Sequence, residues 1–142
     1  MRAPAVRAAI VDAIEAISPT SQVSTEDVFR IHDYDTPARD RAFRVDRIAP
    51  QSPARSLLTT IGSGADAYRL SFVLSCFYME SRGTTERKLE DGDQILDALR
   101  GLPGDHVQIR NVEITGGIDT LDPGGFWLVS WDIVIEYDRR DA

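Results

Sequence analysis

The sequence predicts an α+β fold: a mostly antiparallel, mixed sheet of about four to five strands with two main helices packed on one face. Two long segments, residues 68–79 and 126–138, alternate between apolar and polar side chains, which is typical of strands with one buried face. Two others, residues 6–17 and about 84–102, space their apolar side chains as amphipathic helices do. Two helices over one face of the sheet would bury all these apolar surfaces.

Both predicted helices carry local signals. Apolar side chains in residues 6–17 recur at i, i+3, i+4, i+7, i+8 and i+11, and the helix should end before Pro19, because the residue preceding a proline avoids the helical region. The second helix begins at Thr84 or Thr85, either of which suits a helix N-cap. Gly92 lies inside this helix and costs roughly 1 kcal/mol relative to alanine, which favours a kink or a break there.

The segment between the first helix and the first long strand is the least regular part of the chain. Prolines, glycines and aspartates interrupt residues 33–66. Short strands are expected near this region and within it, at residues 28–31, 43–48 and 57–61.

A β-hairpin is expected to close the chain. Residues 107–115 form its first strand, and their alternation changes phase near Arg110 and Asn111, which indicates a β-bulge. Residues 116–125 are rich in glycine and aspartate and form the predicted connection, with a mobile tip.

The unusual side chains of the long strands are interpreted as core residues. Cys76 falls on the apolar face of its strand, where a small buried hydrophobe is favoured over a nucleophile. Trp127 and Trp131 could stack on a base or a sugar, but their spacing places both on the inward face with aliphatic neighbours.

Composition limits the class of protein. A chain of 142 residues with 42% hydrophobic and 27% charged residues fits one folded domain, residues 1–142. The net charge of −7 argues against general nucleic-acid binding, which needs a basic surface. A single cysteine permits no intrachain disulfide, which fits a reducing cytosol or an assembly that needs no covalent crosslinks. Acidic residues interrupt the alanine-rich N-terminus, so neither a signal peptide nor a membrane span is expected.

No sequence motif indicates catalysis. Residues 32–35 and His106 contain metal-ligand types, but their spacing matches no known metal motif. Residues 62–66 resemble a phosphate-binding loop, yet they lack the GK[ST] sequence and precede a strand instead of a helix. Neither a nucleophile elbow nor a hydrolytic triad is supported. We therefore expect no enzyme activity, no cofactor and no metal.

Charge is distributed unevenly along the chain. Residues 39–55 hold five arginines and two aspartates, a balance of +3 that leaves −10 elsewhere. The second helix, in contrast, is acidic, with Glu86, Glu90, Asp91, Asp93 and Asp97. A basic segment and an acidic helix on one subunit could meet between neighbours, head to tail, in a ring. Alternatively, both are solvated surface without a partner.

The organisation resembles a known family. The opening helix at residues 6–17, the strand–helix unit at residues 68–102 and the closing hairpin ending Trp131-Asp-Ile-Val-Ile-Glu-Tyr137 are similar to the tail terminators of tailed phages, of the minor tail protein U type. The resemblance covers most of the chain in order and pattern. Residues 33–66 match poorly, which leaves open a different neck or tail-completion protein.

The resemblance implies a structural function. Such a subunit forms a hexameric ring on the tail tube, ends tube polymerisation and presents the surface that joins the tail to the head. Its partners would be other copies of itself, the tail tube protein and a head-completion or neck protein, with no specific nucleic acid and no membrane. It would be found in the host cytoplasm during assembly and then in the virion tail. The particle could be a siphovirus, a prophage remnant or a gene-transfer particle.

Candidate contact residues follow from charge and loop position, because no family motif identifies them. For subunit or tube contact we predict the arginines of the basic segment, Arg39, Arg41, Arg44 and Arg47. Reversing Arg41 and Arg44 to Glu is expected to impair assembly and leave the monomer folded. For axial contact we predict four residues of the hairpin connection, Gly117, Asp119, Asp122 and Gly124.

Two other functions remain open at the level of sequence. A head–tail connector or tail-tube component of the same particle would share the structural role, although a tube subunit would polymerise into filaments. A non-viral α+β domain that binds a small ligand would instead need a closed apolar pocket.

Overall fold

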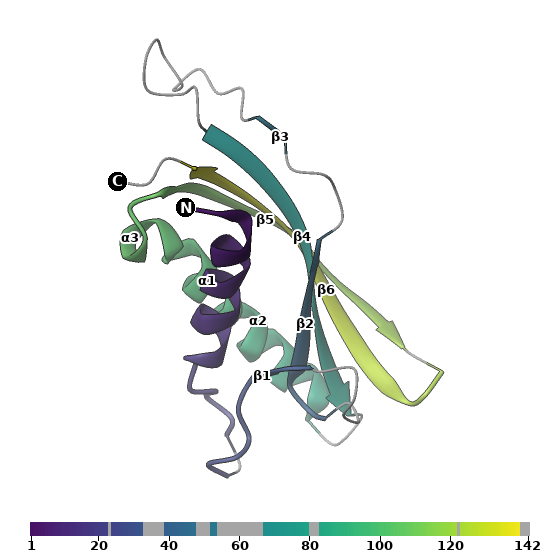
Figure 1. Ribbon diagram of the computed structural model, residues 1–142. Coiled ribbons are helices and arrows are strands. Elements are labelled where there is room, and N and C mark those ends of the chain that lie inside the picture. The colour runs from purple at the N-terminus through teal and green to yellow at the C-terminus, as the bar shows by residue number, and fades with distance from the viewer. Residues whose placement is uncertain are drawn as a thin grey trace.

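The computed structural model describes residues 1–22, 24–32, 39–47, 52–53, 67–79, 83–121 and 123–139. Its helices and strands follow the chain in the order α1 (Ala3–Glu15), β1 (Arg30–Ile31), β2 (Ala42–Arg47), β3 (Ser52–Pro53), β4 (Ala67–Met79), α2 (Thr84–Arg100), α3 (Leu102–Asp105), β5 (Ile109–Leu121) and β6 (Phe126–Asp138). Figure 1 shows a twisted sheet with the helices beside it.

The sheet is mixed, and the predicted α+β class is confirmed. Its strand order is β1-β2-β4-β6-β5, with β3 pairing beside β4. Only β1 and β2 run parallel, whereas the other described pairs are antiparallel. The centre is the long pair β4–β6, which stays in register from Ala67 opposite Asp138 to Met79 opposite Phe126.

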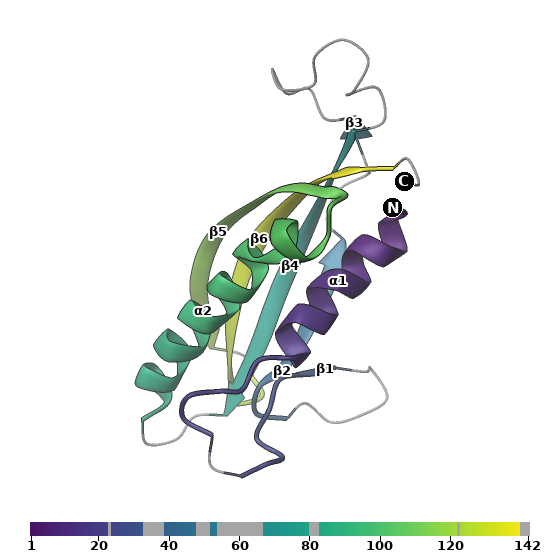
Figure 2. The same cartoon turned by 90° about the vertical axis from the view of Figure 1, so that its left-hand side faces the viewer.

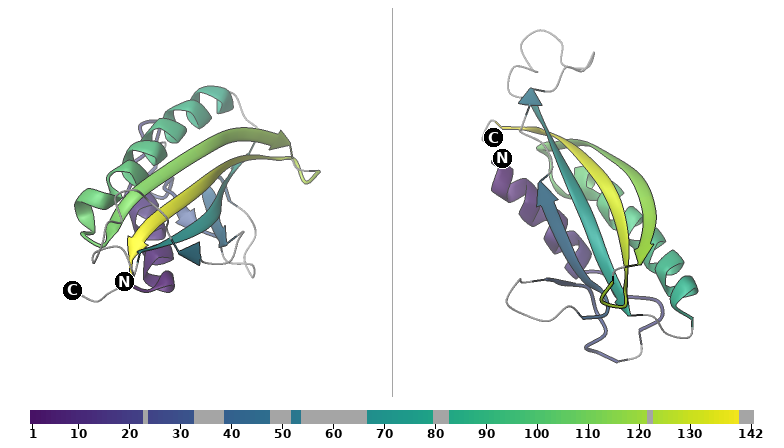
Figure 3. Two further views of the ribbon diagram at one scale, coloured as in Figure 1. Left: turned by 90° about the horizontal axis from the view of Figure 1, so that it is seen from above. Right: turned by 90° about the vertical axis from the view of Figure 1, so that its right-hand side faces the viewer.

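Helices α1 and α2 cover one face of this sheet, as predicted (Figure 2). Val6, Ile10 and Ile14 of α1 are buried together with Ile95 and Leu99 of α2. They join the inward side chains of the strands, namely Phe43, Val45, Leu70, Phe72, Leu74, Cys76, Tyr78, Val129, Trp131, Ile133, Ile135 and Tyr137. No described helix lies over the opposite face (Figure 3, right).

The alternation read from the sequence matches the burial of the two central strands. Every second residue from Leu70 to Tyr78 in β4 is buried, and so is every second residue from Val129 to Tyr137 in β6. Cys76 is fully buried, as predicted, and Trp131 is nearly so. Trp127, near the start of β6, is only partly covered.

A break at Gly92 does not occur, since α2 runs continuously from Thr84 to Arg100. Gly92 is buried against β6, where a Cβ would lie 3.5 Å from Cζ2 of Trp131. The glycine therefore marks a close approach of helix and sheet instead of a break. The chain leaves α2 at Gly101 and forms the short helix α3 directly afterwards.

Strand β5 is longer than predicted. Its register shifts between Ile109 and Asn111, which confirms the predicted bulge, and shifts again between Gly116 and Ile118. Gly116 and Gly117 have φ values of +110° and +87°, which favour glycine. The second shift absorbs both glycines, and pairing with β6 continues to Leu121. The prediction of a connection over residues 116–125 was therefore wrong for residues 116–121.

The short predicted strands have different outcomes. The strand expected at residues 28–31 is found as β1, and the one at residues 43–48 as β2. The one at residues 57–61 lies outside the described residues. None of the described helices is long and apolar enough to cross a membrane.

The two edges of the sheet differ. On one side, β1 pairs with only the first two residues of β2, and Nε of Arg7 donates a hydrogen bond to the carbonyl of Val45 at 3.0 Å farther along that strand. On the other side, β5 is the last strand, and its residues from Thr115 to Leu121 are exposed. An exposed strand edge offers unpaired backbone groups to another chain.

Replacing Gly92 with Ala should stabilise the protein by up to about 1 kcal/mol, because alanine is the better helix former and its methyl group meets Trp131 at ordinary contact distance. Gly117→Ala is the matched control. It should destabilise, because Gly117 has a positive φ and a Cβ there would lie 3.3 Å from Nε1 of Trp131. Urea denaturation measures both changes, and a destabilised Gly92→Ala variant would contradict the packing described.

Candidate functional site

The most strongly connected polar group in the described structure is the guanidinium of Arg41. Arg41 immediately precedes β2, has a φ of +64°, and is fully buried. Its Nε and Nη2 donate to both carboxylate oxygens of Asp91, at 2.8 and 3.0 Å. Nη2 also donates to the hydroxyl of Ser21, and Nη1 lies 2.8 Å from a carboxylate oxygen of Asp27. A two-pronged arginine–carboxylate contact of this kind fixes geometry as well as charge.

Tyr78 completes the network from β4. Its hydroxyl donates a 2.8 Å hydrogen bond to Oδ2 of Asp91. Burial, together with the neighbouring Cys76 and Asp91, raises the pKa of Tyr78 far above its ordinary value, so the phenol stays a neutral donor. Burial opposes the charge of Arg41, but the hydrogen bonds and negative charges of Asp91 and Asp27 outweigh it and hold the pKa of Arg41 above its ordinary value.

A second arginine extends the network towards the start of α2. Arg87 is hydrogen-bonded to Asp40, and its Nη2 lies 3.8 Å from Asp27. The other oxygen of Asp40 accepts a hydrogen bond from the backbone N–H of Met79. The network thus ties the chain before β2 to the end of β4 and the first turns of α2. Its role is architectural, because each of its charged groups has an opposite charge within the domain.

Arg41 is therefore not available for contact with another subunit, and its predicted contact role is withdrawn. The expectation that Arg41→Glu would leave the monomer folded is also wrong, since that change would place a third carboxylate beside Asp91 and Asp27. One sequence signal did point to this pair. Asp91 is four residues before Ile95 and eight before Leu99, on the apolar face of the helix, where a carboxylate needs a buried cation.

The other three predicted arginines lie at the surface in different settings. Arg44 points to the uncovered face of the sheet and forms a 3.2 Å ion pair with Asp46. Arg47, at the end of β2, and Arg39, before its start, are exposed. The structure therefore spreads these three arginines along β2 and its start instead of gathering them into one patch. Whether these three contact a partner stays a prediction.

The hairpin residues predicted for axial contact also differ in setting. Gly117 and Asp119 lie on β5 beyond its second register shift. Asp119 forms a 2.7 Å ion pair with Lys88 of α2, and the Lys88 ammonium lies 4.3 Å from the centre of the Trp127 ring. Gly124 is exposed in the turn, whereas Asp122 lies outside the described residues. The Lys88–Asp119 ion pair thus links strand β5 of the hairpin to α2.

Two hollows lie between α2 and this hairpin. The first holds about 320 Å³, and its apolar lining comes from Leu89, Leu96, Val129 and Trp131. The second holds about 550 Å³ and reaches Trp127 and the first turn of α2. Lys88 and Asp119 line both hollows, so their ion pair lies between them.

The uncovered face of the sheet is partly apolar. Phe77 pairs with Leu128, and Met79 pairs with Phe126, on the face that α1 and α2 leave bare. The ring of His32 packs edge-on against Phe77, with 5.5 Å between centroids. Met79 is 52% exposed, and Ile118 of β5, on the same face, is 67% exposed. Exposed apolar groups on a regular surface suit contact with another protein.

Metal-ligand side chains are not gathered in the described part of the chain. No cluster of three or more His, Cys, Asp or Glu side chains suited to a metal ion is found there. His32 follows β1 and His106 follows α3, elements at opposite ends of the domain (Figure 1). The predicted phosphate-loop resemblance at residues 62–66 lies outside the described residues.

In comparisons with known proteins, no family model and no curated protein matches this chain. Function is therefore inferred from the surfaces and the network described above.

Arg41→Met should destabilise the protein by about 3–5 kcal/mol, because it leaves Asp91 charged, buried and without its cation. Adding Asp91→Leu should recover part of the loss, since the double variant removes both buried charges. Chemical denaturation of the single and double variants measures the coupling. Arg69→Met, at an exposed arginine of β4, is the control and should change stability by less than about 0.5 kcal/mol. Equal stability of Arg41→Met and the control would refute the structural role of the network.

The thiol of Cys76 should not react with alkylating agents in the native protein. Burial raises the pKa of this thiol to about 12, so almost no thiolate is present at pH 8, and the sulfur is inaccessible. Between the unfolded value near 9 and about 12, only the unfolded chain loses this proton, so the Cys76 contribution to stability falls as pH rises through that interval. Mass spectrometry after iodoacetamide treatment, with and without urea, checks the reactivity. Rapid native labelling would contradict it.

Proposed function

We propose that this protein is a structural subunit that assembles as a ring and caps the tail tube of a phage or related particle. The observation that carries the proposal is the one-sided covering of the sheet. Both main helices lie on one face, while the other face and the β5 edge expose Met79, Ile118 and Leu121 at 52%, 67% and 53%. An enzyme pocket would not need such a surface, whereas a subunit of an assembly would.

The order of elements agrees with the family resemblance. Along the chain, a leading helix is followed by a long strand, a helix and a terminal hairpin. The resemblance to tail terminators implies the same order of elements. The irregular region does not add to this support, since much of it lies outside the described residues. The support that the resemblance gives to the proposal therefore comes from α1, β4, α2 and β6.

In this proposal the hairpin contacts the tube or the neck. Its turn lies at the end of the sheet away from α3 (Figure 1). Its apolar residues Ile118 and Leu121 follow the second register shift, which lets the strand carry two glycines without losing its pairing with β6. The Lys88–Asp119 ion pair steadies it against α2. A steadied hairpin can present a fixed surface at little conformational cost on binding.

Capping needs no chemistry. A ring bound to the growing end would cover the surface that recruits the next tube subunit and offer a new surface to a head-completion or neck protein. Arg39, Arg44 and Arg47 are proposed contacts between subunits or with the tube, and Gly117, Asp119 and Gly124 are proposed axial contacts. The proposed setting is the host cytoplasm during assembly and the virion tail afterwards.

One observation favours a second candidate. The hollow of about 320 Å³ between α2 and the hairpin has Trp131 and two leucines in its lining, which suits a small apolar ligand. It lies open beside a strand edge, whereas ligand sites usually enclose most of the ligand. A small molecule that stays bound through purification and is detected by native mass spectrometry would favour this candidate over the ring subunit.

Negative-stain electron microscopy of the concentrated protein, with light scattering on the same sample, tests the proposal. We expect closed six-fold rings, in solution or at the ends of added tail tubes. Long filaments would indicate a tube subunit instead. A monomer that added tubes do not recruit would refute the assignment to a tail.

Ile118→Lys should abolish binding to tube ends and leave the stability of the monomer within about 0.5 kcal/mol, because Ile118 is mostly exposed. Val107→Lys is the matched control. Val107 is 90% exposed just before the opposite end of β5, so this change should leave tube binding intact. Co-sedimentation with purified tubes measures both. Equal binding by the two variants would remove the hairpin from the contact.

A further inference from the structure

The outward face of α2 is unusually acidic. Glu86, Glu90, Asp93 and Asp97 follow one another at i, i+4, i+7 and i+11, which places them on one side of the helix. All four are exposed, and within the described residues none of them forms an ion pair. Neighbouring like charges at these spacings destabilise a helix, so this face would gain from a cationic partner.

The cations of α2 do little to neutralise this face. Arg87 turns towards Asp40 and Asp27, and Lys88 turns towards Asp119. Arg100 lies on the acidic side but only at its C-terminal end. At the flank of the same face, Leu89 is 68% exposed. The surface is therefore a row of carboxylates with one protruding leucine.

A groove of complementary character lies beside β1. It holds about 240 Å³, and its apolar lining comes from Val28, Ile31 and Ala42. Arg30 and Arg39 also line it, are exposed, and form no ion pair within the described residues. The acidic groups of the lining are Glu26 and Asp40, and Asp40 is already held by Arg87 and the Met79 amide. His32 also lines the groove.

The two surfaces are separate patches of the domain, although Arg87 of α2 reaches Asp40 in the wall of the groove. Figure 2 shows α2 along one side of the helical layer and β1 near the other, in agreement with a strand order that has β1 and β5 at its two ends. A contact between them is heterologous: each copy uses its helix towards one neighbour and its groove towards the other. Two acidic faces would repel each other, which disfavours a symmetric dimer through α2.

We infer that the subunits of the assembly meet by docking the acidic face of α2 of one copy into the Arg30–Arg39 groove of the next. This inference rests on the proposed function, since it names the surface through which the ring closes. Leu89 of one copy covers the apolar floor of the groove, and the carboxylates beside it face the two guanidinium groups. Charged rims of this kind set the partner and the orientation, while the apolar centre excludes water.

Charge reversal tests the inference. One variant carries Arg30→Glu and Arg39→Glu, and the other carries Glu90→Arg and Asp93→Arg. Each alone should weaken self-association at least tenfold by light scattering, because like charges then face each other. Mixing the two variants should restore assembly, since each groove then meets an oppositely charged helix and the copies alternate around the ring. Circular dichroism and thermal unfolding confirm that both variants are folded.

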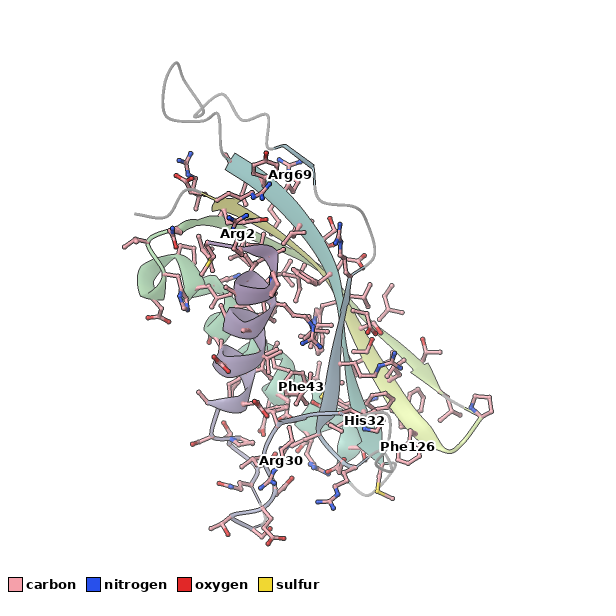
Figure 4. The ribbon with its side chains drawn as sticks, in the orientation of Figure 1. Arg2, Arg30, His32, Phe43, Arg69 and Phe126 are labelled. Carbon is pink, nitrogen blue, oxygen red and sulfur yellow. The ribbon has the colours of Figure 1, made fainter. Side chains whose placement is uncertain are left out.

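The matched control is the double variant Arg2→Glu and Arg69→Glu. Both arginines are exposed, and Figure 4 shows them at the end of the domain away from Arg30. This variant should assemble as the unmodified protein does. Leu89→Ser should weaken association without a change in its salt dependence, because it removes only the apolar part of the contact.

The outcomes separate this contact from the proposed function. If both reversal variants assemble like the control, or if the mixture does not recover, the α2–groove contact is overturned, while rings at the tube end would still support the proposed function. If the unmodified protein forms no assembly at any concentration and is not recruited by tubes, the proposed function and this contact fail together.

Discussion

The buried pair of Arg41 and Asp91 is the constraint on which the rest of the described structure depends. A carboxylate on the apolar face of α2 can be buried only if a cation and further donors accompany it. Arg41 supplies the cation and Tyr78 a further donor, while Ser21 and Asp27 hold the guanidinium of Arg41, and these contacts join α2 to both β2 and β4. The pair also fixes the rotation of α2, so that its four other carboxylates must face outward.

Most of the fold could be predicted because the core is periodic. The apolar spacing of α1 and the alternation of β4 and β6 each repeat over more than ten residues, so single exceptions do not hide the pattern. The length of β5 could not be predicted, since two glycines look like a turn unless the partner strand is known to continue beside them. Gly92 misled for a related reason: a residue that weakens a helix locally can lie inside an unbroken helix, here where α2 passes close to Trp131.

The candidate site was harder to predict than the fold. Charge counted along the sequence identified a basic segment. It could not show that Arg41 is buried inside the domain while Arg39 remains at the surface. That distinction depends on contacts between residues 50 positions apart. The groove beside β1 could not be predicted, because its lining joins residues 26–32 with residues 39–42, which only the folded chain places around one hollow.

The unequal edges of the sheet bear on how the protein avoids uncontrolled aggregation. A sheet with two open edges can add strands at both and grow into a fibre. Within the described residues, the short β1 and the Arg7 side chain cover part of one edge, while the β5 side is open. A second copy that paired through its own β5 would cover this open edge and leave only the partly covered edges outward. A sheet with one open edge strand can therefore bind a partner through β5 and still favour finite complexes over fibres.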